Sequence, residues 1–229
     1  MMKALSIIHA PFERPGVIED WFKAKKYSLL EVHPYRGDPL PSVDEFDGLI
    51  VMGGPQSPLE IEDAPYLRNE IQLIKQALNQ NKSALGFCLG AQLIGEALGA
   101  QTERSPHKEV GVYPITLTGD GEKDPAFKNL QKTFQVTHWH NDMPGLTSTS
   151  KILAYSEGCP RQAIRYTDKA LGFQCHPEIT FELAQALVQN CPDDLRPNSY
   201  VQSREEFLSQ NFHAINQTMM QILENFYQF

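Results

Sequence analysis

An apolar strand that turns sharply into a helix around one cysteine constrains the fold of this chain more than any other feature. Residues 83–92 read Ser-Ala-Leu-Gly-Phe-Cys-Leu-Gly-Ala-Gln, so Cys88 stands between Gly86 and Gly90, and a helical pattern follows at once. The two glycines leave room for a strained turn that exposes the cysteine, as in a nucleophile elbow. The N-terminus of the helix points at the sulfur and favours the thiolate. We therefore interpret Cys88 as a nucleophile rather than as a buried structural cysteine, the commonest role of a free cysteine.

Short apolar strands alternate with amphipathic helices on either side of this turn. The pattern predicts strands at 4–9, 28–33, 48–52 and 84–87, with helices at 16–25 and 65–79. Such alternation indicates an α/β fold, in which a mainly parallel central sheet is flanked by helices. A small antiparallel portion is expected from strands at 110–117, 133–137, 151–156, 163–166 and 170–174, followed by a helix at 180–188.

A histidine and a glutamate stand two residues apart where the last of these strands ends. The segment 170–178 reads Ala-Leu-Gly-Phe-Gln-Cys-His-Pro-Glu. Side chains two apart in an extended segment point to the same side, so Glu178 can orient the ring of His176 while the other ring nitrogen faces Cys88. This is the arrangement of a nucleophile, a base and a residue that orients the base. Pro177 interrupts the strand and places the pair at its end.

A third apolar strand runs into Gly53-Gly54-Pro55. Glycines after a strand let backbone N–H groups approach a ligand closely. Alone, this segment indicates an ordinary turn. Together with the other two segments, it predicts that the N–H groups of Gly54 and Leu89 form an oxyanion hole.

These segments resemble class I (triad-type) glutamine amidotransferases, above all the glutaminase half of GMP synthase and stand-alone proteins related to it. The likeness spans roughly residues 3–190 and rests on 53–55, 86–92 and 174–178, with weaker matches at 108–111 and 138–142. It implies a flavodoxin-like domain that hydrolyses the side chain of glutamine through a γ-glutamyl thioester and releases ammonia. No cofactor is expected.

The resemblance also implies substrate-binding positions. The segment His138-Trp139-His140-Asn141-Asp142 is placed near the glutamine pocket, where the backbone or polar groups of His140, Asn141 and Asp142 hold the α-amino and carboxylate groups. Gln92 either contacts the bound glutamine or faces solvent as a polar residue of the helix N-terminus. The His-x-His-x-Asp pattern lacks a second histidine directly after the aspartate, so no metal site is predicted.

Charge and cysteine content exclude other classes of protein. The net charge of −8 argues against a nucleic-acid surface, and no segment of the sequence is long and apolar enough for a membrane span. The N-terminal apolar run is too short for a signal peptide and fits a first strand. The four cysteines show neither a Cys-x-x-Cys spacing nor a disulfide framework, and a reactive thiol needs a reducing compartment, so the cytoplasm is expected.

Three functions remain open at this point. The first is a glutaminase or amidotransferase whose ammonia goes to an unidentified acceptor, because the sequence contains no phosphate-binding loop for an acceptor reaction of its own. An acceptor synthetase subunit is then an expected partner. The second is a γ-glutamyl peptidase or hydrolase that acts on small γ-glutamyl compounds. The third, disfavoured by the complete triad, is a non-catalytic regulatory protein on the same fold.

The C-terminal segment departs from the minimal family domain. We expect a domain at 1–190 and a helical extension at 191–229, whose apolar residues recur at helical spacing (Phe207, Phe212, Ile215, Met219, Ile222 and Phe226). This extension either packs on the domain, which we favour, or offers a surface for a partner, a lid or a homodimer.

Overall fold

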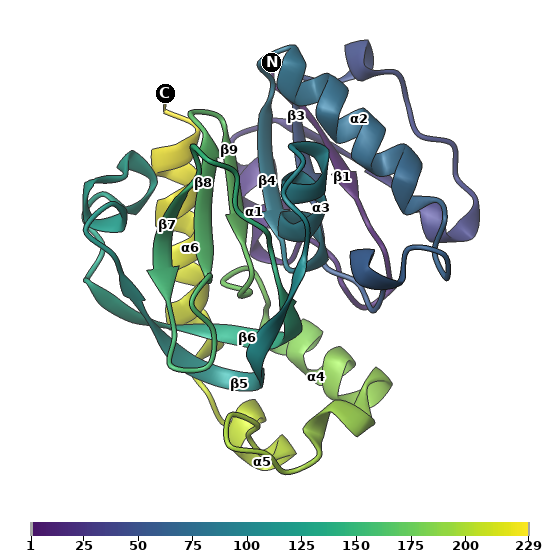
Figure 1. Ribbon diagram of the computed structural model, residues 1–229. Coiled ribbons are helices and arrows are strands. Elements are labelled where there is room, and N and C mark those ends of the chain that lie inside the picture. Colours follow the sequence, from purple (N-terminus) through teal and green to yellow (C-terminus); the bar gives the residue numbers. More distant parts are fainter. Residues whose placement is uncertain (1, 229) are drawn as a thin grey trace.

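One nine-stranded sheet runs through the protein, whose computed structural model describes residues 2–228 (Figure 1). The strands are β1 (Lys3–Ile7), β2 (Ser28–Val32), β3 (Gly48–Val51), β4 (Ser83–Phe87), β5 (Glu103–Leu117), β6 (Thr133–Met143), β7 (Lys151–Tyr155), β8 (Ala163–Thr167) and β9 (Ala170–Phe173). Their order across the sheet is β2-β1-β3-β4-β9-β8-β7-β5-β6. The first five pair in parallel and the remaining pairs are antiparallel. The predicted α/β fold, with a parallel sheet and an antiparallel portion, is confirmed.

Helices cover both faces of this sheet (Figure 1). On one face lie α1 (Val17–Ala24) and α6 (Phe212–Phe226), and on the other lie α2 (Leu67–Asn79) and α3 (Leu89–Ala97). A third apolar cluster joins α4 (Phe181–Asn190) and α5 (Arg204–Leu208) to β5 and β6. In the described part of the chain, no helix combines the length and the apolar character that crossing a bilayer requires.

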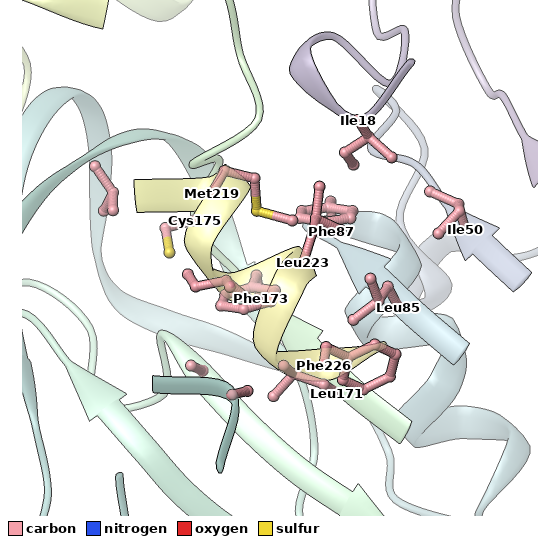
Figure 2. Close-up of a cluster of buried hydrophobic side chains, with 14 of the residues drawn as sticks. Ile18, Ile50, Leu85, Phe87, Leu171, Phe173, Cys175, Met219, Leu223 and Phe226 are labelled. Atoms are coloured by element: carbon pink, nitrogen blue, oxygen red, sulfur yellow. The ribbon is translucent and has the colours of Figure 1, made fainter. Parts of the chain in front are cut away.

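The C-terminal helix α6 contributes to the main hydrophobic core (Figure 2). Its residues Met219, Leu223 and Phe226 belong to the same buried cluster as Phe87 of β4 and Phe173 of β9, whose rings stack with centroids 5.5 Å apart. All six apolar residues that the sequence singled out in this segment are buried. The expectation that the segment packs on the domain therefore agrees with the burial of α6, while a division of the chain at residue 190 stays a prediction.

Two strands extend beyond their predicted limits. β5 begins at Glu103 and β6 continues to Met143, so the polar run 138–142 belongs to a strand rather than to a loop. The two strands pair with each other over most of their length, with an irregularity between Arg104 and Glu109. Cross-strand hydrogen bonds hold the polar segment extended, a non-local effect that its residue pattern did not reveal.

Helix α3 packs unusually close to the carboxyl end of β3. A Cβ atom placed on Gly90, in the first turn of α3, would overlap the carbonyl oxygen of Val51 in β3. A Cβ on Gly86 would in turn lie 2.5 Å from the backbone of Gly90. Only glycine therefore lets the helix start directly after Cys88 while the strands stay paired.

We predict that Gly90→Ala destabilises the fold by about 1–3 kcal/mol because the added methyl group overpacks this contact. Helix propensity alone would favour alanine by about 1 kcal/mol, so the sign of the change is diagnostic. Urea unfolding of both proteins measures it. Gly119→Ala is the matched control, since a Cβ there has no neighbour within 4 Å. A Gly90→Ala protein as stable as the wild type would contradict the close approach.

Candidate active site

Cys88 occupies the turn between β4 and α3 in a backbone conformation that non-glycine residues seldom adopt. Its φ is 49° and its ψ is −110°, and its N–H donates a 2.7 Å hydrogen bond to the carbonyl of Phe173. Because β3, β4 and β9 are parallel neighbours, the residues that follow them meet at one edge of the sheet. Gly53, Cys88 and His176 all follow these strands. The strained turn expected from the sequence is thus present.

The side chains of His176 and Glu178 face each other beside this turn. Nδ1 of His176 lies 2.7 Å from Oε1 of Glu178, and both residues are buried. The backbone N–H of His176 also donates a 2.7 Å hydrogen bond to the carbonyl of Thr137, which fixes the position of the residue. Burial lowers the pKa of His176, but the Glu178 carboxylate and the Cys88 side chain outweigh it and raise the pKa well above its usual value. The ring is therefore held as an imidazolium beside the sulfur.

Gln174, which was not among the predicted site residues, contacts the sulfur of Cys88. Its amide Nε2 donates a 3.2 Å hydrogen bond to Sγ of Cys88, and its Oε1 accepts a 3.0 Å hydrogen bond from Nε2 of Gln92. Both glutamines are buried, so the solvent-facing alternative for Gln92 is wrong. A signal was available, because alternation along an extended segment puts Gln174 on the same side as His176.

The two residues predicted to form the oxyanion hole lie close together. Gly54 and Leu89 both line the cavity that contains Cys88, and a Cβ on Gly54 would lie 3.0 Å from Cδ2 of Leu89. Within the described residues, neither N–H donates a hydrogen bond. Both donors are therefore free to bind an oxyanion, although their role stays a prediction.

A buried ion pair holds the loop that carries Gly54. Nε2 of His9 lies 2.7 Å from Oε2 of Glu70, and Nδ1 of His9 donates a 3.1 Å hydrogen bond to the carbonyl of Gly53. Neither side chain of the pair is exposed. Burial would lower the pKa of His9, but Glu70 outweighs this and raises it. A charged histidine thus orients the peptide before Gly54.

A cavity of about 200 Å³ opens in front of Cys88. Its lining includes all four predicted substrate-binding residues, Gln92, His140, Asn141 and Asp142. It also includes residues that the sequence analysis did not propose, namely Glu13, Ser57, Glu60, Arg104, Trp139, Cys191 and Asp194. The size and the polar lining suit a small, charged substrate.

Asp142 connects three segments at the rim of this cavity. Ser57 Oγ donates a 2.7 Å hydrogen bond to one carboxylate oxygen, and Arg104 Nη1 donates a 2.7 Å hydrogen bond to the other. Arg104 also pairs with Glu60 at 3.1 Å and remains half-exposed. A carboxylate and a guanidinium side by side provide partners for both charged ends of an amino acid.

The side chain of His140 points away from the cavity. Its Nδ1 donates to the backbone carbonyl of Asp142 at 3.2 Å, and its Nε2 lies 3.1 Å from Oε2 of Glu109. The imidazole is fully buried, so only the backbone of His140 borders the cavity. Glu109 thus fixes the strand that carries Asn141 and Asp142.

Glu109 is the centre of a buried polar cluster. Ser156 donates to both of its oxygens, at 2.8 Å and 2.9 Å, and Gln162 Nε2 donates at 2.6 Å. Glu109, His140 and Cys159 present ligand-type atoms within 4.8 Å of one another, a spacing that could hold a metal ion. The carboxylate is already satisfied by Ser156 and Gln162, which favours a hydrogen-bonded network over a metal centre.

The chain beyond α4 supplies another wall of the cavity. Asp194 accepts hydrogen bonds from Lys108 Nζ at 2.6 Å and from the indole N–H of Trp139 at 2.8 Å. The carbonyl of Trp139 in turn lies 3.8 Å from Sγ of Cys88. Asp194 therefore links the C-terminal segment to the residues around Cys88.

Comparison with known proteins identifies relatives of this chain. The family described as glutamine amidotransferase class-I matches residues 25–192. The glutamine amidotransferase-like protein YfeJ of Salmonella typhimurium is 41% identical over 97% of this chain and 96% of its own length. A glutamine-hydrolyzing GMP synthase subunit of Methanococcus aeolicus is 33% identical over 62% of this chain and 71% of its own. The crystal structure of a glutamine amidotransferase from Thermotoga maritima superposes with a TM-score of 0.88, at 25% identity over 100% and 99% of the two chains.

We predict that Gln174→Ala slows alkylation of Cys88 by iodoacetamide about tenfold at pH 7. The substitution removes the N–H donor beside the sulfur, and a hydrogen bond to a charged group contributes about 1.5–3 kcal/mol. Time-resolved intact mass measures the rate. An unchanged rate, with an unchanged unfolding midpoint, would show that Gln174 does not support the thiolate.

A second prediction concerns stability and pH. Burial lowers the pKa of His138 to about 4, so between pH 6.5 and 4 the unfolded chain binds a proton that the folded chain does not. Stability therefore falls as the pH falls through this window, by about 2 kcal/mol from pH 7 to pH 5 for this group. Urea unfolding of the wild type and of His138→Gln at both pH values tests it. Equal pH dependence of the two proteins would contradict the prediction.

Proposed function

The chain belongs to the class I glutamine amidotransferase family, and on that premise we propose that it hydrolyses the side-chain amide of glutamine to release ammonia for an acceptor. The observation that carries the proposal is the convergence of Cys88, His176 and Glu178 at the carboxyl ends of parallel strands. Cys88 opens into a cavity whose charged rim suits an amino acid.

In the first half of the reaction, the Cys88 thiolate attacks the side-chain carbonyl carbon of glutamine. The oxygen gains negative charge and is bound by the N–H groups of Gly54 and Leu89. His176 donates its proton to the leaving nitrogen, the carbon–nitrogen bond breaks, and a γ-glutamyl thioester remains on the sulfur. Glu178 holds the ring through Nδ1, which directs Nε2 at the reacting atoms.

In the second half, water replaces the ammonia beside His176. The now neutral imidazole removes a proton from this water as it attacks the thioester carbonyl. The same two backbone N–H groups bind the second oxyanion. Collapse of this intermediate breaks the carbon–sulfur bond, releases glutamate and restores the thiolate–imidazolium pair.

The fate of the ammonia is part of the proposal. The related protein of Methanococcus aeolicus is named as one subunit of a glutamine-hydrolyzing GMP synthase. This supports an acceptor synthetase as the partner. The four cysteines are unpaired, and a thiol nucleophile is preserved in a reducing compartment, which supports a cytoplasmic location.

We predict that a glutamine-like electrophile, such as a γ-diazoketone analogue, adds mass at Cys88 only. Burial raises the pKa of Cys159 and Cys191 to about 11 and also raises that of Cys175, so these thiols should remain unlabelled. Ammonia release from glutamine is followed in parallel. Cys88→Ala abolishes both signals, and Glu178→Gln lowers ammonia release by about 100-fold or more because the ring loses its orienting charge.

The same assay separates the alternatives. If Cys88 is labelled and the protein hydrolyses small γ-glutamyl peptides but releases no ammonia from glutamine, the activity is that of a γ-glutamyl hydrolase and not of a glutaminase. Ammonia release that survives in a folded Cys88→Ala protein would overturn the proposal. Circular dichroism and the unfolding midpoint establish that each variant is folded.

A further inference from the structure

Glu13 brings an additional carboxylate to the active site. It lies in the loop between β1 and α1, more than 70 residues before the nucleophile, and lines the same cavity as Cys88 and Gly54. The residue is half-buried and belongs to the lining of this cavity. None of the motifs around Cys88, Gly53 or His176 contains it.

The position of this carboxylate is defined by Gly53. A Cβ placed on Gly53 would overlap Oε2 of Glu13 and would lie 3.0 Å from Cε1 of His176. The carboxylate and the edge of the imidazole therefore converge on one glycine. Cε1 separates the two ring nitrogens, of which Nδ1 is occupied by Glu178. Glu13 thus lies beside the ring of His176, whose remaining nitrogen, Nε2, transfers the proton in the proposed reaction.

The carboxylate of Glu13 has no hydrogen-bond donor among residues 2–228. Among the hydrogen bonds and ion pairs of residues 2–228, none uses a side-chain oxygen of Glu13. By contrast, Glu70, Glu109 and Glu178 each contact a histidine ring. A carboxylate that borders a cavity without a protein donor is available to a ligand that carries N–H groups.

Together these observations point to a role in the first half of the reaction. We propose that Glu13 is a further catalytic residue, whose carboxylate accepts hydrogen bonds from the leaving nitrogen of the scissile amide. The inference rests on the proposed function and deepens it. It assigns to this site substrates whose leaving group is an amine with N–H groups, with ammonia as the smallest.

The chemistry balances without a net change at Glu13. His176 gives its proton to the leaving nitrogen, the carbon–nitrogen bond breaks, and the electron pair of that bond stays on nitrogen. As the nitrogen becomes tetrahedral, its N–H groups point at the carboxylate, which accepts hydrogen bonds and takes up no proton. The interaction strengthens as positive charge develops on nitrogen, so it favours the transition state over the bound amide.

The charges around Glu13 are consistent with this role. Burial, as the main cause, raises its pKa to about 6, while the rings of His176 and His9 oppose the rise and Glu178 and Asp194 add to it. Near neutral pH the group is still ionised, as an acceptor of hydrogen bonds must be.

The test compares two leaving groups on one acyl group. Glutamine releases ammonia, whereas the γ-methyl ester of glutamate leaves through an oxygen that carries no hydrogen of its own. Glutamine and the ester form the same thioester on Cys88, so the second half of the reaction, hydrolysis of that thioester, is identical for the two substrates. We expect Glu13→Gln and Glu13→Ala to lower kcat/KM for glutamine by about 10- to 100-fold and to change kcat/KM for the ester less than threefold. Rapid-quench measurement of thioester formation locates the loss in the first half.

Glu19→Gln is the matched control. It removes the same charge from a partly exposed residue of α1 that pairs with Arg14, and should leave both rates unchanged. An equal loss for glutamine and ester in the Glu13 variants would overturn the proposal, because it would indicate a general effect on the site. No loss for glutamine would overturn it as well. Wild-type protein that hydrolyses neither compound would instead overturn the proposed function on which the inference rests.

Discussion

The backbone turn at Cys88 is the constraint on which the rest of the site depends. The chain must leave β4 and enter α3 within one residue. This turn requires the positive φ of Cys88, which strains its backbone. The turn is maintained because α3 contacts the end of β3 through Gly90, with no side chain between them. Parallel pairing of β4 with β3 and β9 then brings the loops after these strands to the sulfur. The geometry of Cys88 is therefore a property of the sheet, and not of a mobile loop.

Three buried glutamates then fix three parts of the site, and each glutamate acts through a histidine that it contacts. Glu178 orients His176, the proposed proton carrier, and Glu109 fixes His140, which precedes the rim residues Asn141 and Asp142. The third pair, Glu70 with His9, holds the peptide before the predicted oxyanion donor. Burying charges costs free energy that pairing only partly recovers. These pairs therefore add more to the placement of reacting groups than to stability.

The sequence could predict those features of the site that depend on residues close together in the chain. Cys88, His176 and the glycines before Pro55 lie at the ends of apolar strands, so their places follow from strand ends alone. The path of β6 could not be predicted, because His138, Trp139 and the residues after them owe their extended conformation to pairing with β5. Glu13 was missed for a similar reason. Nothing in its neighbours indicates that the loop after β1 passes the end of β3, and only the folded sheet brings them together.

The residues that complete the cavity lie mostly outside the motifs that indicate the chemistry. The motifs supply a nucleophile, a base and the donors for an oxyanion, which any amide or ester of glutamate would require. Choice among such substrates depends on contacts to the atoms that do not react and to the leaving group. Outside the motifs, the cavity offers Arg104, Asp194 of the C-terminal segment and Glu13 of the first loop for such contacts. Two chains with the same triad can therefore differ in substrate, and these three residues are where this chain would differ.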